Sequence, residues 1–280
     1  MLAVRCGSHI PEGCAGAGPA GSASSLLRMR FSEALVLLAA GTAGGIFSTV
    51  VAIASLVTYP VLLALGVPPL SANMTNTVSL VFTGASSVAA SKPELAGQGR
   101  RVLRLGVVTA LGGAAGAAVL LLTPASAFTV VVPVLIGGAS LVLLVQPRIS
   151  LLTPPAVLDT RHRLALGAAL FAVAVYVGYF GAAAGVMLLV VLSAMIREPL
   201  VRVNAIKNAV SGIANALAAV CFALFGDVQW KLVLPLAAGF LIGGWIGPKI
   251  ARRVPAGVFR VFVSLCGLGL AVKLGISAYR

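Results

Sequence analysis

The chain has 280 residues, of which 60% are apolar and only 9% are charged, and its mean hydropathy is +1.09. Soluble globular domains are about half apolar and a quarter charged, so this composition indicates an integral membrane protein and excludes an ordinary soluble domain. The net charge of +14 does not indicate nucleic-acid binding, because the basic residues lie mainly in short loops between apolar stretches, as the positive-inside rule expects.

Residues 1–30 are rich in Gly, Ala and Ser and lack the continuous apolar stretch of a secretory signal. We expect them to form a disordered N-terminal tail, or to lie upstream of the true translation start, because Met29 closely precedes the first apolar stretch. The four cysteines are divided between this tail and apolar stretches, so their spacing indicates neither a disulfide framework nor a zinc site.

Apolar stretches long enough to cross a bilayer follow one another along nearly the whole chain after residue 30. The polar interruptions between them are too short to form a soluble domain with a core of its own. The sequence therefore predicts an all-α polytopic membrane protein with about eight transmembrane helices. The apolar stretches lie at about residues 31–66, 72–91, 102–122, 126–145, 164–196, 203–225, 230–248 and 257–278.

Two of these stretches, 31–66 and 164–196, are too long for one straight crossing. Each contains glycines that interrupt a helical pattern, so we expect a broken helix or a hairpin that turns back inside the membrane. We place the interruptions at Gly41, Gly44 and Gly45 in the first stretch and at Gly178, Gly181 and Gly185 in the second.

Short motifs recur in the two halves of the chain in the same order. The string Asn-x-Val-Ser begins at Asn76 and again at Asn208, 132 positions later, and two further landmarks recur at an offset of 131. This order predicts two homologous four-helix repeats, at residues 31–145 and 164–280, joined by a cytoplasmic loop at 146–163. The further landmarks pair Gly112-x-x-x-Gly116 with Gly243-x-x-x-Gly247, which we expect to pack helices closely, and Pro124-Ala-x-x-Phe128 with Pro255-Ala-x-x-Phe259.

The charges in the loops leave two membrane topologies open. If each long stretch crosses once, the basic residues that the loops and chain ends carry from Arg28 onward divide eleven against five, and if each turns back they divide twelve against four. Both topologies place loops 92–104 and 146–163 in the cytoplasm. We favour the hairpin topology, because the glycine interruptions and the inverted repeats of transporters agree with it.

The second helix of each predicted repeat carries a polar stripe. Asn76, Ser79 and Thr83 recur at helical spacing in the first half, and a similar stripe runs along residues 204–215 in the second. Lipid is a poor solvent for such a face, so it must meet protein or water, and the ammonium of Lys207 suits a small oxyanion. The candidate substrate-binding residues are Asn73, Thr75, Asn76, Thr77, Ser79, Tyr179, Asn204, Lys207, Asn208 and Ser211.

Several of these candidates have a structural alternative. Lys207 could begin a helix and extend to the headgroup region, and Asn73 and Asn204 could cap the starts of their helices. Tyr179 could be a packing residue or an interfacial anchor. We prefer the binding interpretation for Lys207, because ionisable residues inside membranes are generally functional.

Carboxylates and histidines are absent from the interior of the apolar stretches. The acidic residues lie at helix ends, in loops or in the tail, which argues against a membrane enzyme, a proton relay, a metal site and cation transport. No Gly-x-x-x-x-Gly-Lys-Ser/Thr string occurs, so ATP drive is not expected. We predict no cofactor and no metal. The expected partners are a small anionic substrate and the lipid bilayer, and a homo-oligomer is left open.

Six segments of the chain resemble the sulfite exporter TauE/SafE family. The resemblance covers nearly all of residues 31–278, but Val51–Leu56 lacks the Gly or Ser rich break that family members often carry before the Pro of the first element. The segments are Ala43–Val51, Tyr59–Pro69 and Ala72–Val78 in the first half, and Tyr176–Gly185, Asn204–Asn208 and Gly226–Trp230 in the second.

The resemblance implies a multi-pass permease of the bacterial inner membrane, with eight transmembrane helices, that moves sulfite, sulfonates or related sulfur-containing anions. Together with the polar stripes, it favours outward movement of a small anion with Lys207 as the main charge partner. Two alternatives stay open: a permease for another organic anion or metabolite, working outward or inward, and a membrane scaffold that transports nothing.

Overall fold

The computed structural model describes residues 31–149 and 159–251, together with short helical pieces between residues 265 and 276. The predicted tail at 1–30, half of the loop at 146–163 and most of the stretch at 257–278 lie outside the described residues. Every described element is a helix, with no strand among them, as the sequence predicts. The helices are α2 (Phe31–Val50), α3 (Ala54–Ala64), α4 (Pro69–Ala90), α5 (Lys92–Leu95), α6 (Gly99–Leu122), α7 (Ala125–Ile149), α8 (Thr160–Tyr179), α9 (Ala184–Met195), α10 (Leu200–Phe225) and α11 (Trp230–Ala251).

Five of the described helices, α2, α6, α8, α10 and α11, are long and apolar enough to cross a membrane. Three more, α3, α7 and α9, contribute shorter apolar helical segments. The 22-residue α4 is too polar for this group, and its polar face is buried by the helices around it. The protein is therefore a polytopic helical membrane protein, while the organisation into two four-helix repeats stays a prediction.

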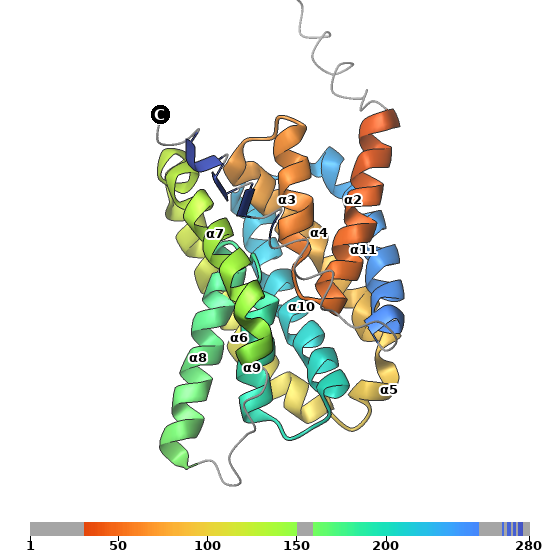
Figure 1. The fold of residues 1–280 in the computed structure, drawn as a ribbon, viewed down its shortest axis with the longest axis vertical. Coiled ribbons are helices and arrows are strands. Elements are labelled where there is room, and N and C mark those ends of the chain that lie inside the picture. Colours follow the sequence, from red (N-terminus) through yellow and green to blue (C-terminus); the bar gives the residue numbers. More distant parts are fainter. Residues whose placement is uncertain are drawn as a thin grey trace, which may run out of the picture.

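Both long apolar stretches are broken into a pair of helices. The first breaks at residues 51–53, where Ala52 has a φ of +64°, and the second at 180–183, where Gly181 and Ala183 have φ of +71° and +53°. Left-handed backbone at a non-glycine residue is uncommon and marks a sharp change of chain direction. In Figure 1, α3 turns back beside α2, and α9 turns back beside α8. Ala52 and Ala183 are 131 positions apart, the same offset as the glycine and proline landmarks.

The predicted position of the first interruption is wrong. Gly41, Gly44 and Gly45 lie inside α2, which runs unbroken to Val50. These glycines give α2 a surface that α11 approaches closely, so that a Cβ at Gly45 would lie 2.9 Å from the Cα of Gly243. The glycines in α2 therefore serve helix packing, and the chain turns further along, where no glycine is present.

The Gly-x-x-x-Gly pairs have the packing role that the sequence predicts. Gly243 and Gly247 of α11 face α2, and Gly112 and Gly116 of α6 face α8. A small residue at such a position lets two backbones approach within van der Waals contact, which supplies much of the attraction between helices in lipid. The first hairpin thus packs on a helix of the second half, and the second hairpin on a helix of the first.

Helices α4 and α10 occupy the centre of the bundle and cross each other. At the crossing, a Cβ on Gly84 would lie 2.7 Å from the Cα of Gly212. Each helix begins directly after a proline, at Pro68 and Pro199, which fixes φ and suits the first turn of a helix. The two polar helices are therefore held in direct contact at the middle of the protein.

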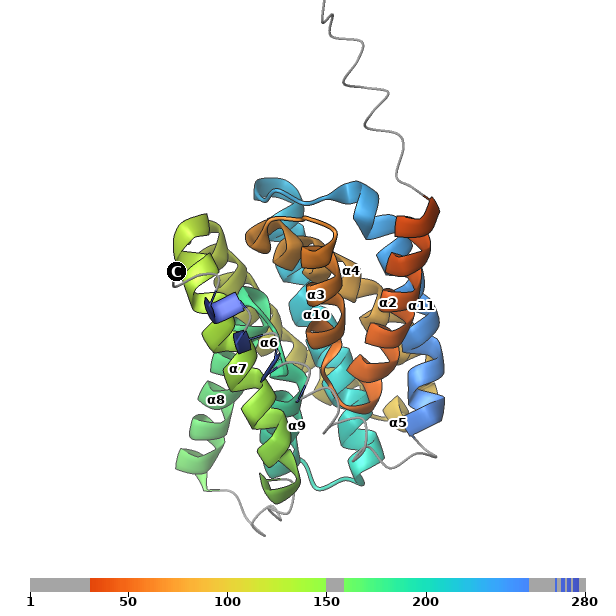
Figure 2. The ribbon, with the colours of Figure 1, turned by 45° about the horizontal axis from the view of Figure 1, so that its top comes forward.

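The arrangement of helix ends agrees with the hairpin topology. Figures 1 and 2 show α5, the start of α8 and the loop from α9 to α10 at one end of the bundle, with the starts of α2 and α11 at the other. The basic residues follow this division. Of those in the described residues, one end carries Lys92, Arg100, Arg101, Arg104, Arg161, Arg163, Arg197, Arg202 and Lys249, and the opposite end carries Lys231.

Candidate functional site

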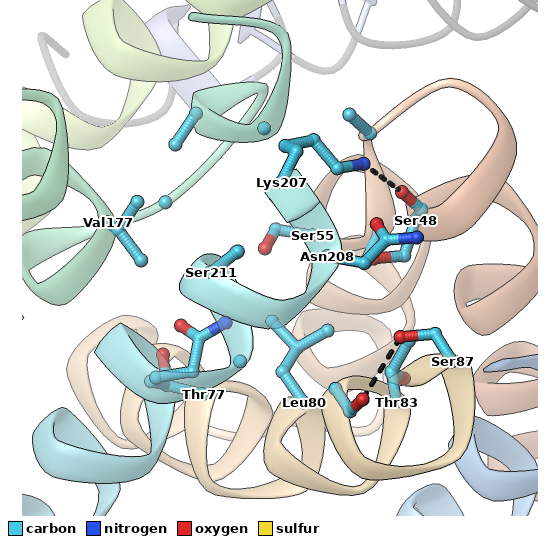
Figure 3. Close-up of a pocket in the computed structure, with 18 of the residues that line it drawn as sticks. Ser48, Ser55, Thr77, Leu80, Thr83, Ser87, Val177, Lys207, Asn208 and Ser211 are labelled. Atoms are coloured by element: carbon cyan, nitrogen blue, oxygen red, sulfur yellow. Dashed lines mark hydrogen bonds between the residues drawn. The ribbon is translucent and has the colours of Figure 1, made fainter. Parts of the chain in front are cut away.

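A cavity lies where the tips of both hairpins meet α4 and α10 (Figure 3). The tips touch each other, since a Cβ at Gly185 would lie 2.6 Å from the Cβ of Ala52. About 50 Å³ of the cavity is open to the centres of water-sized molecules. At roughly 10–15 Å³ for each water, that is space for about four waters or one small ion.

Lys207 lies at the cavity wall with its side chain almost fully buried, at 2% exposure. Its ammonium donates a hydrogen bond to the main-chain carbonyl of Ser48, near the end of α2, at 3.2 Å. Figure 3 shows the side chain reaching from α10 toward this carbonyl. The alternative in which Lys207 extends to the headgroup region is therefore wrong.

Asn208, the next residue of α10, has a donor that is unused within the described part of the chain. Its side chain lines the cavity and is 7% exposed, and its buried Nδ2 has no hydrogen-bond partner. Leaving a buried donor unsatisfied costs about 1–3 kcal/mol, so such groups are rare in native structures. An ammonium has three donors, and Lys207 uses one on Ser48. This wall of the cavity therefore offers more donors than the protein has acceptors for them.

The charge of the cavity is set by Lys207. Of the described residues that line it, none is acidic, and the others are polar and neutral or apolar. The described residues also contain no group of three or more His, Cys, Asp or Glu side chains that could hold a metal ion. A buried cation beside one unused amide donor can bind an anion, whose oxygens accept from both Lys207 and Asn208.

Asn73 and Asn204 neither cap their own helices nor line the cavity. Asn73 Nδ2 donates to the carbonyl of Tyr179 at 2.8 Å, and Asn204 Nδ2 donates to the carbonyl of Thr49 at 2.9 Å. These carbonyls lie at the C-terminal ends of α8 and α2, where a helix leaves carbonyls without an intrahelical partner. Each asparagine thus holds the end of the hairpin helix that belongs to the other half of the chain.

Asn76 is hydrogen-bonded to the first hairpin through both ends of its amide. Its Oδ1 accepts from Thr58 at 2.6 Å and its Nδ2 donates to Ser55 at 3.1 Å. These bonds fix α3 against α4, and Asn76 is not among the residues that line the cavity. Asn76 is a structural residue in this conformation, in contrast to Asn208.

The remaining candidates divide in the same way. Thr77 and Ser211 line the cavity. Thr75 instead accepts from the backbone N–H of Gln229 at 3.0 Å, and Ser79 donates to the carbonyl of Thr75 at 2.8 Å. The ring of Tyr179 lies edge-on to Phe128, with 6.0 Å between ring centroids, as a packing residue. The structure thus brings together Thr77, Lys207, Asn208 and Ser211 and places the other six candidates outside the cavity.

Sequence reasoning missed the contribution of the hairpin tips. Ser48, Ser55, Gly181 and Gly185 all line the cavity and were not among the candidates. The signal in the second half was the glycine-rich string from Tyr176 to Gly185, where the helix breaks and the chain lines the cavity. The first half carries no such signal, because its turn is made at an alanine.

Comparison with known proteins settles the family. The chain matches the sulfite exporter TauE/SafE family over residues 37–274. The chain belongs to this family. It is also 21% identical over 244 residues to the probable membrane transporter protein ORF9 of Sinorhizobium sp., an alignment that covers 85% of this chain and 90% of that protein. No solved structure matches significantly. The TauE/SafE chain is therefore a multi-pass membrane protein of a transporter family.

At one end of this TauE/SafE protein, a carboxylate joins α6 to the start of α10. Glu198 accepts from Arg202 at 3.0 Å, from Gln98 at 3.1 Å and from Arg101 at 3.3 Å. The hydrogen bond from Arg202 is the main reason that the pKa of Glu198 lies below its usual range, with Gln98 and Arg101 adding to the effect. We call these four residues the Glu198 cluster. They tie α6 to α10 at the end of the protein where the basic residues gather.

A second polar connection joins helices at the opposite end. Ser71, near the start of α4, donates to the carboxylate of Asp227 at 2.7 Å. Asp227 also accepts from the side chain of Gln229 at 3.4 Å, and the backbone of Gln229 donates to Thr75. The cavity thus lies between two sets of polar contacts, one toward each end of the bundle.

Proposed function

We propose that the protein is a permease for a small anion, with sulfite, a sulfonate or a related sulfur-containing anion as its substrate. The observation that carries this proposal is the pairing of a buried ammonium, Lys207, with the unpartnered amide of Asn208 on one wall of a cavity without acidic residues. An uncompensated buried charge is costly in a membrane protein, and a bound anion would offset that cost. The family's description as sulfite exporters supports a sulfur oxyanion.

The position of the cavity supports transport. Inside a bilayer, non-helical backbone is tolerated only where protein buries it or a water-filled space adjoins it. Both hairpin tips, at Ala52 and at Gly181–Ala183, are non-helical and adjoin the cavity, in the manner of the discontinuous helices of secondary transporters. We infer that the two halves of the chain are repeats of one unit whose broken elements meet at the substrate.

The distribution of basic residues between the two ends of the bundle indicates the direction of transport. We assign the end of the bundle that carries Lys92, Arg101 and Lys249 to the cytoplasm, because basic residues concentrate on that side of a membrane. An anion that leaves a cell with a negative interior moves downhill by about 2.3 kcal/mol per charge per 100 mV. Export would therefore need no coupled ion, which fits a chain that has no ATP-binding string.

The test replaces the cation. Lys207→Met keeps the length of the side chain and removes its charge and its donors, and sulfite flux into proteoliposomes should fall to the level of empty vesicles. Lys231→Met makes the same change at an exposed lysine and should leave flux unchanged. Equal flux in the Lys207→Met and unaltered proteins would remove Lys207 from the mechanism.

The alternatives have tests of their own. Counterflow against a panel of sulfite, sulfonates and carboxylates distinguishes sulfur oxyanions from other organic anions and reports whether the protein also works inward. Single cysteines at positions 208 and 211, in a chain whose native cysteines are replaced, distinguish a permease from a scaffold. A permease predicts that water-soluble thiol reagents modify both positions, and complete protection of both would favour dry helix contacts.

A further inference from the structure

The two walls of the cavity differ in hydrogen-bonding character. The α10 wall presents donors that the protein does not use, from Lys207 and Asn208. On the α4 wall, the hydroxyl of Thr77 donates to the carbonyl of Asn73 at 2.9 Å, and that of Ser87 donates to the carbonyl of Gly84 at 3.0 Å. A hydroxyl that donates its proton to its own helix has only acceptor lone pairs left for a ligand.

The charge and the size of the cavity further limit which ligands it can bind. Lys207 supplies one positive charge, and no acidic residue lines the cavity among those described. A dianion would leave a net negative charge buried away from water, which is strongly unfavourable. The open space of about 50 Å³ suits a compact ion of about four heavy atoms.

Resting on the proposed function, we propose that the cavity binds the singly protonated form of a small oxyanion: a monoanion whose deprotonated oxygens accept from Lys207 and Asn208 and whose remaining O–H donates to one hydroxyl oxygen of the α4 wall, that of Thr77 or that of Ser87. For sulfite this species is hydrogen sulfite. The dianion lacks the O–H donor and carries one charge too many. The substrate crosses with its proton, and each turnover moves one net negative charge.

The first test separates titration of the substrate from titration of the protein. Flux of labelled sulfite and of labelled selenite is measured in proteoliposomes across neutral pH, with equal pH on both sides and the membrane potential clamped at zero. The flux of each should follow its own monoanion and fall by about tenfold for each pH unit above that ion's protonation midpoint. Hydrogen selenite loses its remaining proton at a higher pH than hydrogen sulfite does, so the selenite profile should lie at higher pH.

Several outcomes would overturn this assignment. Coincident pH profiles for the two ions would show that a protein group titrates, and flux that rises with pH would show that the dianion is carried. Sulfate, which stays doubly charged throughout this pH range, should be transported poorly, and equal transport of sulfate would contradict the proposal. A requirement of the flux for Na⁺ would show that the hydroxyls of the α4 wall bind a cation instead of the O–H of the substrate, and would contradict the proposal.

A second test addresses the hydroxyls of the α4 wall directly. Thr77→Val and Ser87→Ala each remove one hydroxyl oxygen from the α4 wall. Loss of the one that accepts from the substrate should lower hydrogen sulfite flux severalfold while leaving the midpoint of the pH profile in place. Thr129→Val is the matched control, because Thr129 also donates to its own helix, at 2.8 Å from the carbonyl oxygen of Ala125, but is exposed outside the cavity. Unchanged flux and affinity in both folded variants would exclude the hydroxyls of the α4 wall from the site. Absence of flux for every oxyanion in the unaltered protein would instead contradict the proposed function itself.

Discussion

The side chain of Asn204 donates a hydrogen bond to the carbonyl of Thr49, 155 residues earlier in the chain, at 2.9 Å. Thr49 is fully buried near the end of α2, where the helix offers its carbonyl no partner. Asn73 makes the equivalent bond to Tyr179 at the end of α8. The hairpin tips that form the cavity therefore depend on one amide from each of the two central helices.

The first prediction concerns these amides. Asn204→Ala should destabilise the protein by about 1–3 kcal/mol, because it leaves the carbonyl of Thr49 buried without a partner. Asn73→Ala should cost a similar amount at Tyr179. Thermal unfolding in mild detergent would measure both changes, and a stability equal to that of the unaltered protein would show that these bonds do not hold the tips.

Asn208 should behave in the opposite way. Because its Nδ2 has no partner within the described residues, Asn208→Ala removes an unsatisfied buried donor and should leave stability unchanged or slightly raised. Anion flux should nevertheless fall by about tenfold or more, a loss of about 1.4 kcal/mol in binding. Thermal unfolding and proteoliposome flux are measured on the same preparation, and a variant that loses stability while keeping its flux would reverse this assignment.

Close packing between α2 and α11 yields a third prediction. A Cβ at Gly45 would lie 2.9 Å from both the Cα of Gly243 and the backbone nitrogen of Gly244, so Gly45→Ala should force the helices apart and cost about 1–3 kcal/mol. Gly138→Ala in α7 is the control, because nothing lies within 4 Å of the added methyl group. The control should be neutral or stabilising, since alanine favours a helix over glycine. Similar melting temperatures for both variants would contradict this packing role.

The Glu198 cluster yields a prediction about pH. Because the pKa of Glu198 is lowered in the folded protein, the carboxylate stays charged through neutral and mildly acidic conditions. Its stabilising effect is present above the ordinary range of a glutamate and is lost as the pH falls through the lowered value. Glu198→Gln should remove this acid dependence from the unfolding profile. An acid limb unchanged in Glu198→Gln would assign the dependence to other groups.

Opening of the end that carries the Glu198 cluster can be followed in the same variant. Glu198→Gln weakens the contacts of Glu198 with Arg101 and Arg202, so a membrane-impermeant thiol reagent should reach a cysteine at position 211 severalfold faster from the side of this cluster. Glu33→Gln, at the start of α2 and the opposite end, is the control. Equal rates of modification in all three proteins would show that the cluster does not limit access.

The sequence predicted the helical fold well because lipid imposes a strong and simple rule. A helix in lipid must form its own backbone hydrogen bonds and needs about twenty residues to cross the bilayer. The positions of seven predicted stretches therefore agree with the observed helices within several residues. The turn at Ala52 was not predicted, because its cause is tertiary. The alanine is held in left-handed backbone by the second hairpin and by the bond from Asn204 to Thr49.

The site was only partly predictable for a related reason. A polar stripe shows that a face must avoid lipid, but not whether each group meets a ligand or another side chain. Asn76 and Asn208 occupy the same place in the string Asn-x-Val-Ser, yet the amide of Asn76 is bonded to Ser55 and Thr58 while Nδ2 of Asn208 has no partner within the described residues. Asn73 and Asn204 make equivalent hydrogen bonds, and Pro68 and Pro199 precede the two central helices. Both pairs are 131 positions apart, so the Asn-x-Val-Ser strings, which are 132 apart, are out of register with them by one residue.

The hydrogen bonds from α4 to the end of α8 and from α10 to the end of α2 bear on how the polypeptide is made. The first hairpin leaves the ribosome well before Asn204 is synthesised. The carbonyl of Thr49 therefore has no hydrogen-bond partner until α10 has been inserted. Neither half of the polypeptide should mature alone, because each would expose a polar helix end to hydrocarbon. Two fragments divided in the central loop should be degraded when produced separately and should rescue each other when produced together.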